Sequence, residues 1–364
     1  MLDEKSLQFF KSYIDTPSPS GYERKAQLMW LDYMKSFVDE ERLDPSNNAI
    51  AVLNPKASFK ILLEAHGDEI SWLVNYIDPY GFIHVLPNGG ADAQVCPGKR
   101  AFIHTNKGTI ACAFGWPAIH LRNYIFDLRI DDSHLFVDCG CSSREEVEKL
   151  GVRVGDVITF RDSLEILNND FIMGRGLDNR IGSLIIAEVA RYFHQMRTDL
   201  PFALYFVNAV QEEVGLKGAK MVADQIRPDV AIVTDVTHDT STPYIDPRKN
   251  GDTRCGRGPV VAIAPSVNKE LLQLTEDVAR ENEIPIQRVA ISRETGTDTD
   301  AISLSRGGVS SILISPPLRY MHTPVEMVCR RDVETTIELI CTMIRRLDLQ
   351  ALKSQHTFVG NELG

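Results

Sequence analysis

The segment 202–219 constrains the fold of this chain more than any other part of the sequence. It begins with a run of apolar, β-branched and aromatic residues, a pattern typical of a buried strand. Two adjacent acids, Glu212 and Glu213, follow directly, and glycines and a helical pattern come after them. In open α/β sheets, ligands bind in the crevice at the carboxyl ends of the strands. Because neighbouring carboxylates repel each other, we expect a cation at this edge of the sheet.

Strand and helix patterns alternate on both sides of the middle of the chain. Helical patterns within 7–38 precede strand patterns at 49–53 and 59–65. Beyond residue 168 we expect helices at 178–194, 216–225, 269–282 and 333–349, and strands at 202–210, 230–234, 259–264, 287–290 and 309–315. This alternation predicts an α/β domain with an open sheet.

The segment 69–164 has a different pattern, with short apolar strands separated by Gly and Pro and one helix expected at 143–150. Such a stretch between two α/β halves indicates an inserted domain. We therefore expect a discontinuous catalytic domain over 1–68 and 165–364, and an inserted β-rich domain over 69–164.

The composition excludes several classes of partner. The chain has 39 basic and 50 acidic residues among 364, a net charge of −11, which argues against nucleic-acid binding. No apolar run approaches the roughly 18 residues that span a bilayer, and the charged N-terminus does not resemble an export signal. The seven cysteines are irregularly spaced and odd in number, so we expect them to be reduced. These features predict a soluble, cytoplasmic protein without membrane or nucleic-acid partners.

Ionisable residues recur where predicted strands end. His66 and Asp68 follow the strand at 59–65, Asp235 follows the strand at 230–234, Asp178 opens a helix, and His322 follows the last strand and the loop at 316–321. Each has an ordinary interpretation alone, such as a helix cap for Asp178. Their convergence with the acid pair at one sheet edge indicates a metal site.

The types of ligand narrow the choice of metal. Imidazole and carboxylate without thiolate suit zinc, cobalt or manganese. Two histidines and three or four carboxylates exceed the need of one catalytic zinc and match a two-metal site with a bridging carboxylate. Successive side chains at a strand end point in different directions, so one acid of the pair could bind metal while the other serves as general base.

Eight segments of the sequence resemble, in order, those of the TET-type aminopeptidases, the glutamyl or deblocking aminopeptidase group of dinuclear zinc peptidases, some of which carry the name endoglucanase. The segments are LEAHGDEI (63–70), DCGCSSREE (138–146), GVRVGD (151–156), GLDNR (176–180), QEEVGLKGA (211–219), TDVTH (234–238), GRGP (256–259) and MHTP (321–324). The resemblance implies that His66 and Asp235 bind one metal ion, that Glu213 and His322 bind a second, and that Asp178 bridges the two. These would be two divalent ions per subunit, with zinc expected and cobalt as a possible alternative.

The same resemblance implies that Glu212 is the general base and that Asp68 orients His66. It also implies a doubly wound α/β catalytic domain with a mixed sheet, carrying an inserted small β-barrel domain of PDZ-like type. In the family this insertion helps to build dimers and tetrahedral dodecamers, so a homo-oligomer is expected. The roles of His120 and His238 stay open.

The expected reaction is hydrolysis of the first peptide bond of short peptides with a free N-terminus. A related metal-dependent amide hydrolase, a deacylase or carboxypeptidase, is the alternative. A glycosidase needs carboxylates about 5–9.5 Å apart on either side of the sugar bond, which adjacent acids do not easily provide. A non-catalytic scaffold is disfavoured by the complete ligand set. The preferred N-terminal residue is open, because the loop 293–300 near the expected substrate pocket carries mixed charges.

Overall fold

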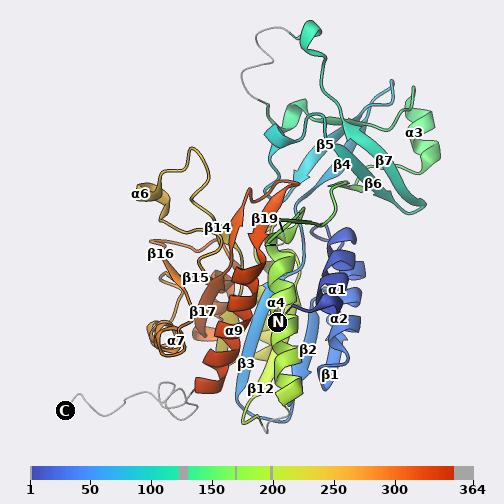
Figure 1. Ribbon diagram of the computed structural model, residues 1–364. Coiled ribbons are helices and arrows are strands. Elements are labelled where there is room, and N and C mark those ends of the chain that lie inside the picture. The colour runs from blue at the N-terminus through green and yellow to red at the C-terminus, as the bar shows by residue number, and fades with distance from the viewer. Residues whose placement is uncertain (1, 123–129, 169, 197–199, 348–364) are drawn as a thin grey trace.

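A mixed eight-stranded sheet forms the central layer of the computed structural model (Figure 1). The structure describes residues 2–122, 130–168, 170–196 and 200–347. In spatial order the strands are β1 (Glu40–Leu43), β2 (Ala49–Leu53), β12 (Ala203–Ala209), β3 (Lys60–His66), β13 (Val230–Val233), β17 (Ser310–Ser315), β15 (Val260–Ile263) and β16 (Gln287–Ala290). Strands β12, β3, β13 and β17 are parallel neighbours, so their carboxyl ends meet at one edge.

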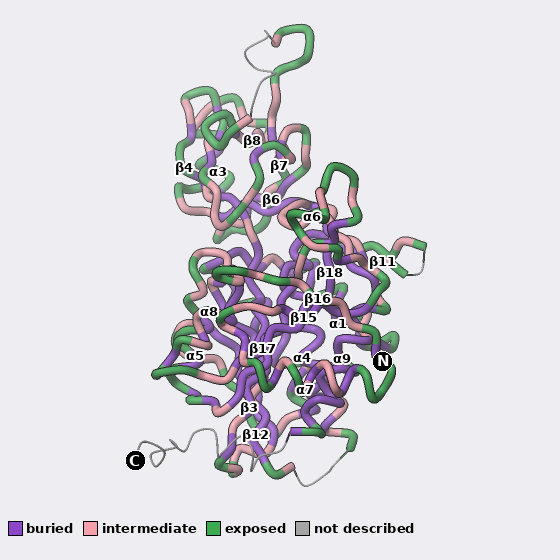
Figure 2. The backbone as a smooth tube through the Cα atoms, turned by 90° about the vertical axis from the view of Figure 1, so that its left-hand side faces the viewer, coloured by how far each residue is buried: buried purple, intermediate pink, exposed green. Residues whose placement is uncertain are grey.

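Helices cover both faces of this sheet (Figure 2). One face carries α1 (Glu4–Asp15), α2 (Arg24–Met34), α4 (Leu177–Met196), α7 (Lys269–Glu281) and α9 (Arg330–Arg346), and the other carries α5 (Lys217–Ile226) and α8 (Asp298–Leu304). Because the central strands are covered on both sides, β12 and β13 are almost wholly buried and read as continuous apolar runs. The predicted doubly wound α/β architecture is confirmed.

The segment after β3 folds into a closed antiparallel barrel with a core of its own. Its strands are β4 (Ser71–Ile77), β5 (Ile83–Asn88), β6 (Arg100–Thr105), β7 (Gly108–Phe114), β8 (Phe136–Asp138) and β9 (Val157–Phe160), with helix α3 (Arg144–Leu150) beside them. The rings of Phe114 and Phe160 pack edge-on against Trp72 at the centre. The barrel projects from one end of the α/β layers (Figure 1), so the expected inserted β-barrel is present.

A second, five-stranded sheet was not predicted from the sequence. It comprises β10 (Glu165–Leu167), β11 (Phe171–Gly174), β19 (Glu326–Cys329), β18 (Pro317–Arg319) and β14 (Thr237–His238). The expectation of a plain loop at 316–321 is wrong, because β18 lies within it. These strands have only two to four residues, too few to leave a periodic pattern in the sequence, and two of their pairings join segments far apart in the chain.

Two further expectations concern membranes and cysteines. Across the described ranges, no helix combines the length and the hydropathy needed to cross a bilayer. All seven cysteines are free thiols, as the irregular spacing predicted.

Candidate metal centre

Strand ends and one helix start bring the predicted ligands and the predicted base to a common point at the carboxyl edge of the sheet. The side chains come from the ends of β3 and β13, the turn after β12, the start of α4 and the segment after β18, and they are His66, Asp178, Glu212, Glu213, Asp235 and His322. Five of them are buried to more than nine-tenths of their side-chain area, and only His322 reaches 30 % exposure. A buried cluster of this charge requires compensation by cations or protons.

The ligating atoms form two groups with one carboxylate between them. The groups are His66, Glu212 and Asp235, and Asp178, Glu213 and His322, and within each group the atoms lie within 4.8 Å of one another. The Oδ1 atom of Asp178 is 3.3 Å from Nε2 of His66, and its Oδ2 atom is 3.3 Å from Nε2 of His322. Asp178 therefore presents one oxygen to each histidine, as a bridging ligand requires.

The spacing of these atoms suits ions bound between them. Donors bound tetrahedrally at about 2.0–2.2 Å from zinc lie about 3.3–3.6 Å apart. Nε2 of His66 is 3.7 Å from both Oε2 of Glu212 and Oδ1 of Asp235, and Nε2 of His322 is 3.4 Å from Oε1 of Glu213. These separations exceed those of direct hydrogen bonds. The residues present thus fit two divalent ions.

The pKa values of the clustered side chains also indicate a site for cations. Burial raises the pKa of the Glu212 carboxyl to about 10, and it also raises the pKa values of Glu213 and Asp235. Burial lowers the pKa of His322, but the carboxylates of Asp178 and Glu213 outweigh that effect and raise it to about 11. The cluster therefore retains protons that divalent ions would displace on binding.

Asp68 connects the end of β3 to the turn after β12. Its carboxylate accepts hydrogen bonds from the backbone N–H groups of Glu212 (3.0 Å) and Glu213 (3.3 Å) and from Oγ of Ser20 (2.6 Å). Nδ1 of His66 lies 3.4 Å from Oδ1 of Asp68, without the geometry of a hydrogen bond. Asp68 thus lies on the far side of the imidazole ring from the ligating atoms and holds both acids of the pair by their backbone.

The side chains of Glu212 and Glu213 point in different directions, but for a different reason from the one predicted. Strand β12 ends at Ala209, and Gln211 has a left-handed backbone (φ 57°), so Glu212 and Glu213 lie in a turn rather than at the strand terminus. The alternation of a strand therefore does not separate their side chains. The turn does, and it directs Glu212 toward His66 and Glu213 toward His322.

The barrel supplies one contact to the site. Nδ1 of His322 lies 2.9 Å from the carbonyl oxygen of Gly90, in the segment that follows β5. Donation from Nδ1 to this carbonyl leaves Nε2 free to face Asp178 and Glu213, which sets the tautomer that a metal ligand needs. A Cβ atom at Gly90 would lie 2.8 Å from the imidazole ring, so glycine permits this close approach.

Glu326 is a supporting residue that the sequence analysis missed. Its carboxylate accepts hydrogen bonds from the backbone N–H of Asp178 (3.1 Å) and of His322 (2.8 Å), and it is buried in β19. The only signal in the sequence is an acid within an otherwise apolar short strand, four residues after His322. That signal does not reveal which backbone groups the acid binds.

The two histidines with open roles lie in different places. His120 is exposed in a short 3₁₀ turn (Ile119–Leu121) that follows β7. His238, on β14, lines a cavity of about 570 Å³ into which the six clustered side chains also open. A cavity of this size can hold a small ligand.

Comparison with known proteins identifies one family. The model of the M42 glutamyl aminopeptidase family matches residues 47–339. The lysyl aminopeptidase of Pyrococcus furiosus is 34% identical over 345 residues, which cover 93% of this chain and 97% of the relative.

Two solved structures share the whole fold. A TET aminopeptidase from a marine sediment Thaumarchaeota archaeon superposes with a TM-score of 0.92 at 31% identity, covering 96% of this chain and 99% of the other. The TET1 peptidase of Pyrococcus horikoshii, which can assemble into a tetrahedron or a large octahedral shell, superposes with a TM-score of 0.82 at 28% identity, covering 94% and 100%.

Proposed function

Because this chain belongs to the M42 glutamyl aminopeptidase family and is an aminopeptidase, we propose that it removes the N-terminal residue of short peptides with two divalent metal ions and Glu212 as the general base. The observation that carries the proposal is the pair of ligand groups that share Asp178. In this proposal His66 and Asp235 would hold one ion, Glu213 and His322 would hold the other, and Asp178, which presents one oxygen to each histidine, would be shared by the two groups. When bound, the ions lower the pKa of a water molecule and polarise the scissile carbonyl.

The chain's own groups move the protons. Glu212 lines the cavity beside His66 and is not required as the sole carboxylate of its group, since Asp235 lies at the same distance from the imidazole. It is therefore free to take a proton from the attacking water and to pass it to the leaving amine. Asp68 holds the backbone of Glu212 in place for this task. Its carboxylate also lies beside Nδ1 of His66, on the side of the ring opposite the ligating Nε2 atom, and limits rotation of the ring.

Zinc is the proposed metal, with cobalt as the alternative, because both accept imidazole and carboxylate ligands. Substrate binding is proposed to require a free α-amino group, as the name aminopeptidase implies. A deacylase or carboxypeptidase activity is the alternative function, since the same ions activate water toward other amides.

Hydrolysis of amino-acid p-nitroanilides tests this proposal. Activity should disappear after treatment with a chelator and return when Zn²⁺ or Co²⁺ is added, and N-acetylated anilides should not be cleaved. Full activity in the chelated enzyme would contradict the metal dependence. Cleavage of the blocked substrates in preference to the free amines would favour the deacylase alternative.

We further propose that residues 1–68 and 165–364 form the catalytic domain and that residues 69–164 form an oligomerisation domain. The closed barrel with its separate core supports this division. By analogy with the TET1 peptidase, which forms a dodecamer and can assemble into a tetrahedron, dimers of this chain would assemble into a tetrahedral dodecamer. The mass in solution should then be twelve times the 40.8 kDa of the chain. We propose the cytoplasm as the location, which agrees with seven free thiols.

A further inference from the structure

The cavity beside the metal ligands is lined almost entirely by uncharged side chains. Apart from the six clustered residues, its described lining contains no Lys, Arg, Asp or Glu, and His238 is its one additional titratable side chain. Apolar groups come from Val289, Ala290, Ile291 and Met321. The four carboxylates of the cluster are balanced when two divalent ions are bound. A substrate side chain that enters this cavity therefore meets no fixed charge that could pair with its own.

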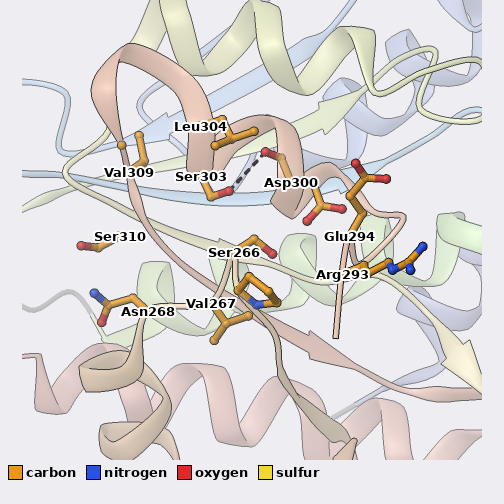
Figure 3. A pocket seen from close by; sticks show the side chains of 12 residues that line it. Ser266, Val267, Asn268, Arg293, Glu294, Asp300, Ser303, Leu304, Val309 and Ser310 are labelled. Carbon is orange, nitrogen blue, oxygen red and sulfur yellow. Dashed lines mark hydrogen bonds between the residues drawn. The ribbon is translucent and has the colours of Figure 1, made fainter. Parts of the chain in front are cut away.

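The loop between β16 and α8 excludes its own charged side chains from this cavity. Ser292, Thr295 and Gly296 line the active-site cavity. Arg293 and Glu294, between them in sequence, line a separate cavity of about 880 Å³ instead. Figure 3 shows the side chains of Arg293 and Glu294 among those that line this second cavity, together with Ser266 and Val267. The mixed charges of this loop, which left the specificity open in the sequence, thus belong to a different surface.

Several other charged residues in segments close to the cavity are paired or do not line it. Thr253 lines the cavity, whereas its neighbours Asp252 and Arg254 are bonded to each other at 2.6 Å on an exposed surface. Asp298 is 1 % exposed and does not line the cavity. Asp239 is paired with Arg319 at 2.8 Å.

We propose that this aminopeptidase selects substrates whose N-terminal side chain is uncharged and apolar, of the size of leucine or methionine, and discriminates against lysine, arginine, glutamate and aspartate. The proposal rests on the function proposed above. Its physical basis is the cost of moving a charged side chain from water into a cavity that offers no partner for it. An apolar side chain gains free energy from the same transfer. The names lysyl and glutamyl that its relatives carry would then not describe this chain.

The test is the ratio of kcat/KM values for a panel of Leu, Met, Lys and Glu p-nitroanilides with the metal-reconstituted, full-length enzyme. We expect the kcat/KM values of the Leu and Met substrates to exceed those of the Lys and Glu substrates at least about tenfold, the lower end of the discrimination that a single methylene group gives in a hydrophobic pocket. A Lys or Glu substrate that matched or exceeded Leu would overturn the proposal.

Variants in the loop between β16 and α8 test the proposal further and supply its matched controls. Ser292 is exposed and lines the cavity, so Ser292→Asp should raise the Lys-to-Leu ratio several-fold, and the neutral, similarly sized Ser292→Asn should leave it unchanged. Arg293→Ala and Glu294→Ala should also leave the ratio unchanged, because these side chains line the other cavity. A shift in either alanine variant as large as that in Ser292→Asp would overturn the proposal. Failure to cleave any member of the panel would instead contradict aminopeptidase function itself, and this proposal with it.

Discussion

Glu212 and Glu213 are neighbours in the chain, yet they belong to different ligand groups. Their backbone N–H groups both bind Asp68, and the turn after β12 sends one carboxylate toward His66 and the other toward His322. The different roles proposed for Glu212 and Glu213 therefore depend on the carboxylate of Asp68, which holds the turn. It can be tested by changing one acid at a time.

The variants Glu212→Gln and Glu213→Gln form a matched pair. Glu212→Gln should retain the metal but lose about 10²–10⁴-fold in kcat, because the general base is removed. Glu213→Gln should lose metal affinity, because an amide is a poorer ligand than a carboxylate. Metal content by mass spectrometry and kcat on one anilide distinguish the two. Equal metal loss in both variants, or unchanged turnover in Glu212→Gln, would contradict the assignment.

Glu326 allows a test of whether residues that bind the backbone of the proposed ligands support metal binding. Its two oxygens accept from two different backbone N–H groups, so Glu326→Gln can keep only one of these bonds and would place an NH₂ group against the other donor. We expect a 10–100-fold loss in metal affinity, the range found when outer partners of ligands are changed. Isothermal titration with Zn²⁺ measures it. Glu338→Gln, at an exposed position of α9, is the control, and equal affinities in the two variants would argue against this role.

The positions of the ligands could be predicted from the sequence, whereas their support could not. His66, Glu212 and Asp235 follow apolar strands, and the carboxyl ends of parallel strands share an edge, so convergence could be inferred. Glu326 and Gly90 act through backbone groups far away in the chain, and nothing in a local pattern identifies such partners.

Among the elements, the segment around β14 shapes the wall of the active-site cavity. Asp239 anchors it by accepting from the backbone N–H and Oγ of Ser241, from the N–H of Cys255 and from Nε of Arg319. Burial raises the pKa of Asp239, but the hydrogen bonds from Ser241 and Arg319 outweigh burial, and the pKa is lowered to about 2. The contribution of this carboxylate to stability is therefore present above the unfolded-state pKa of about 3.9 and is lost as the pH falls toward 2.

Asp239→Asn should lower the free energy of unfolding by about 1–3 kcal/mol at pH 7, the cost of losing hydrogen bonds to a charged group. The difference from wild type should shrink as the pH falls below about 4. Urea denaturation of both proteins at pH 7 and below about pH 4 measures this difference in the free energy of unfolding. Asp224→Asn, on the exposed surface of α5, should change stability little at either pH. A penalty for Asp239→Asn that is independent of pH would contradict the proposed role of its charge.

Long elements were predictable and short ones were not. Apart from β1, which was not predicted, the strands of the main sheet begin and end within about two residues of the positions expected from hydrophobic pattern. The five-stranded sheet escaped detection because strands of two to four residues are too short to show a periodic hydrophobic pattern. Helix α8 escaped because Thr and Asp at its start are typical of loops and caps, and Thr297 does cap it.

At the scale of the whole molecule, the barrel and the α/β layers meet at the candidate metal centre. The carbonyl of Gly90 lies 2.9 Å from Nδ1 of His322, so the barrel segment contacts a site whose proposed ligands all come from the α/β layers and the segments around them. The change of pattern at residue 69 predicted two domains, but nothing in the sequence indicated the contact between Gly90 and His322.

Gly90→Ala tests the connection between the two bodies. The added Cβ would lie 2.8 Å from the imidazole of His322, so the ring must shift and metal affinity should fall about tenfold or more. Gly174→Ala is the control, because its Cβ would meet neighbours only at ordinary distances of 3.5 Å or more. Metal titration of both variants provides the comparison. Wild-type affinity in Gly90→Ala would show that the barrel does not position this ligand.

The central claim, two ions that share Asp178, is tested most directly by anomalous diffraction from a crystal of the zinc-loaded enzyme. The account predicts two anomalous peaks per chain, one beside His66 and Asp235 and one beside Glu213 and His322, each about 2.0–2.2 Å from an oxygen of Asp178. A single peak per chain, or a second peak out of reach of Asp178, would contradict it.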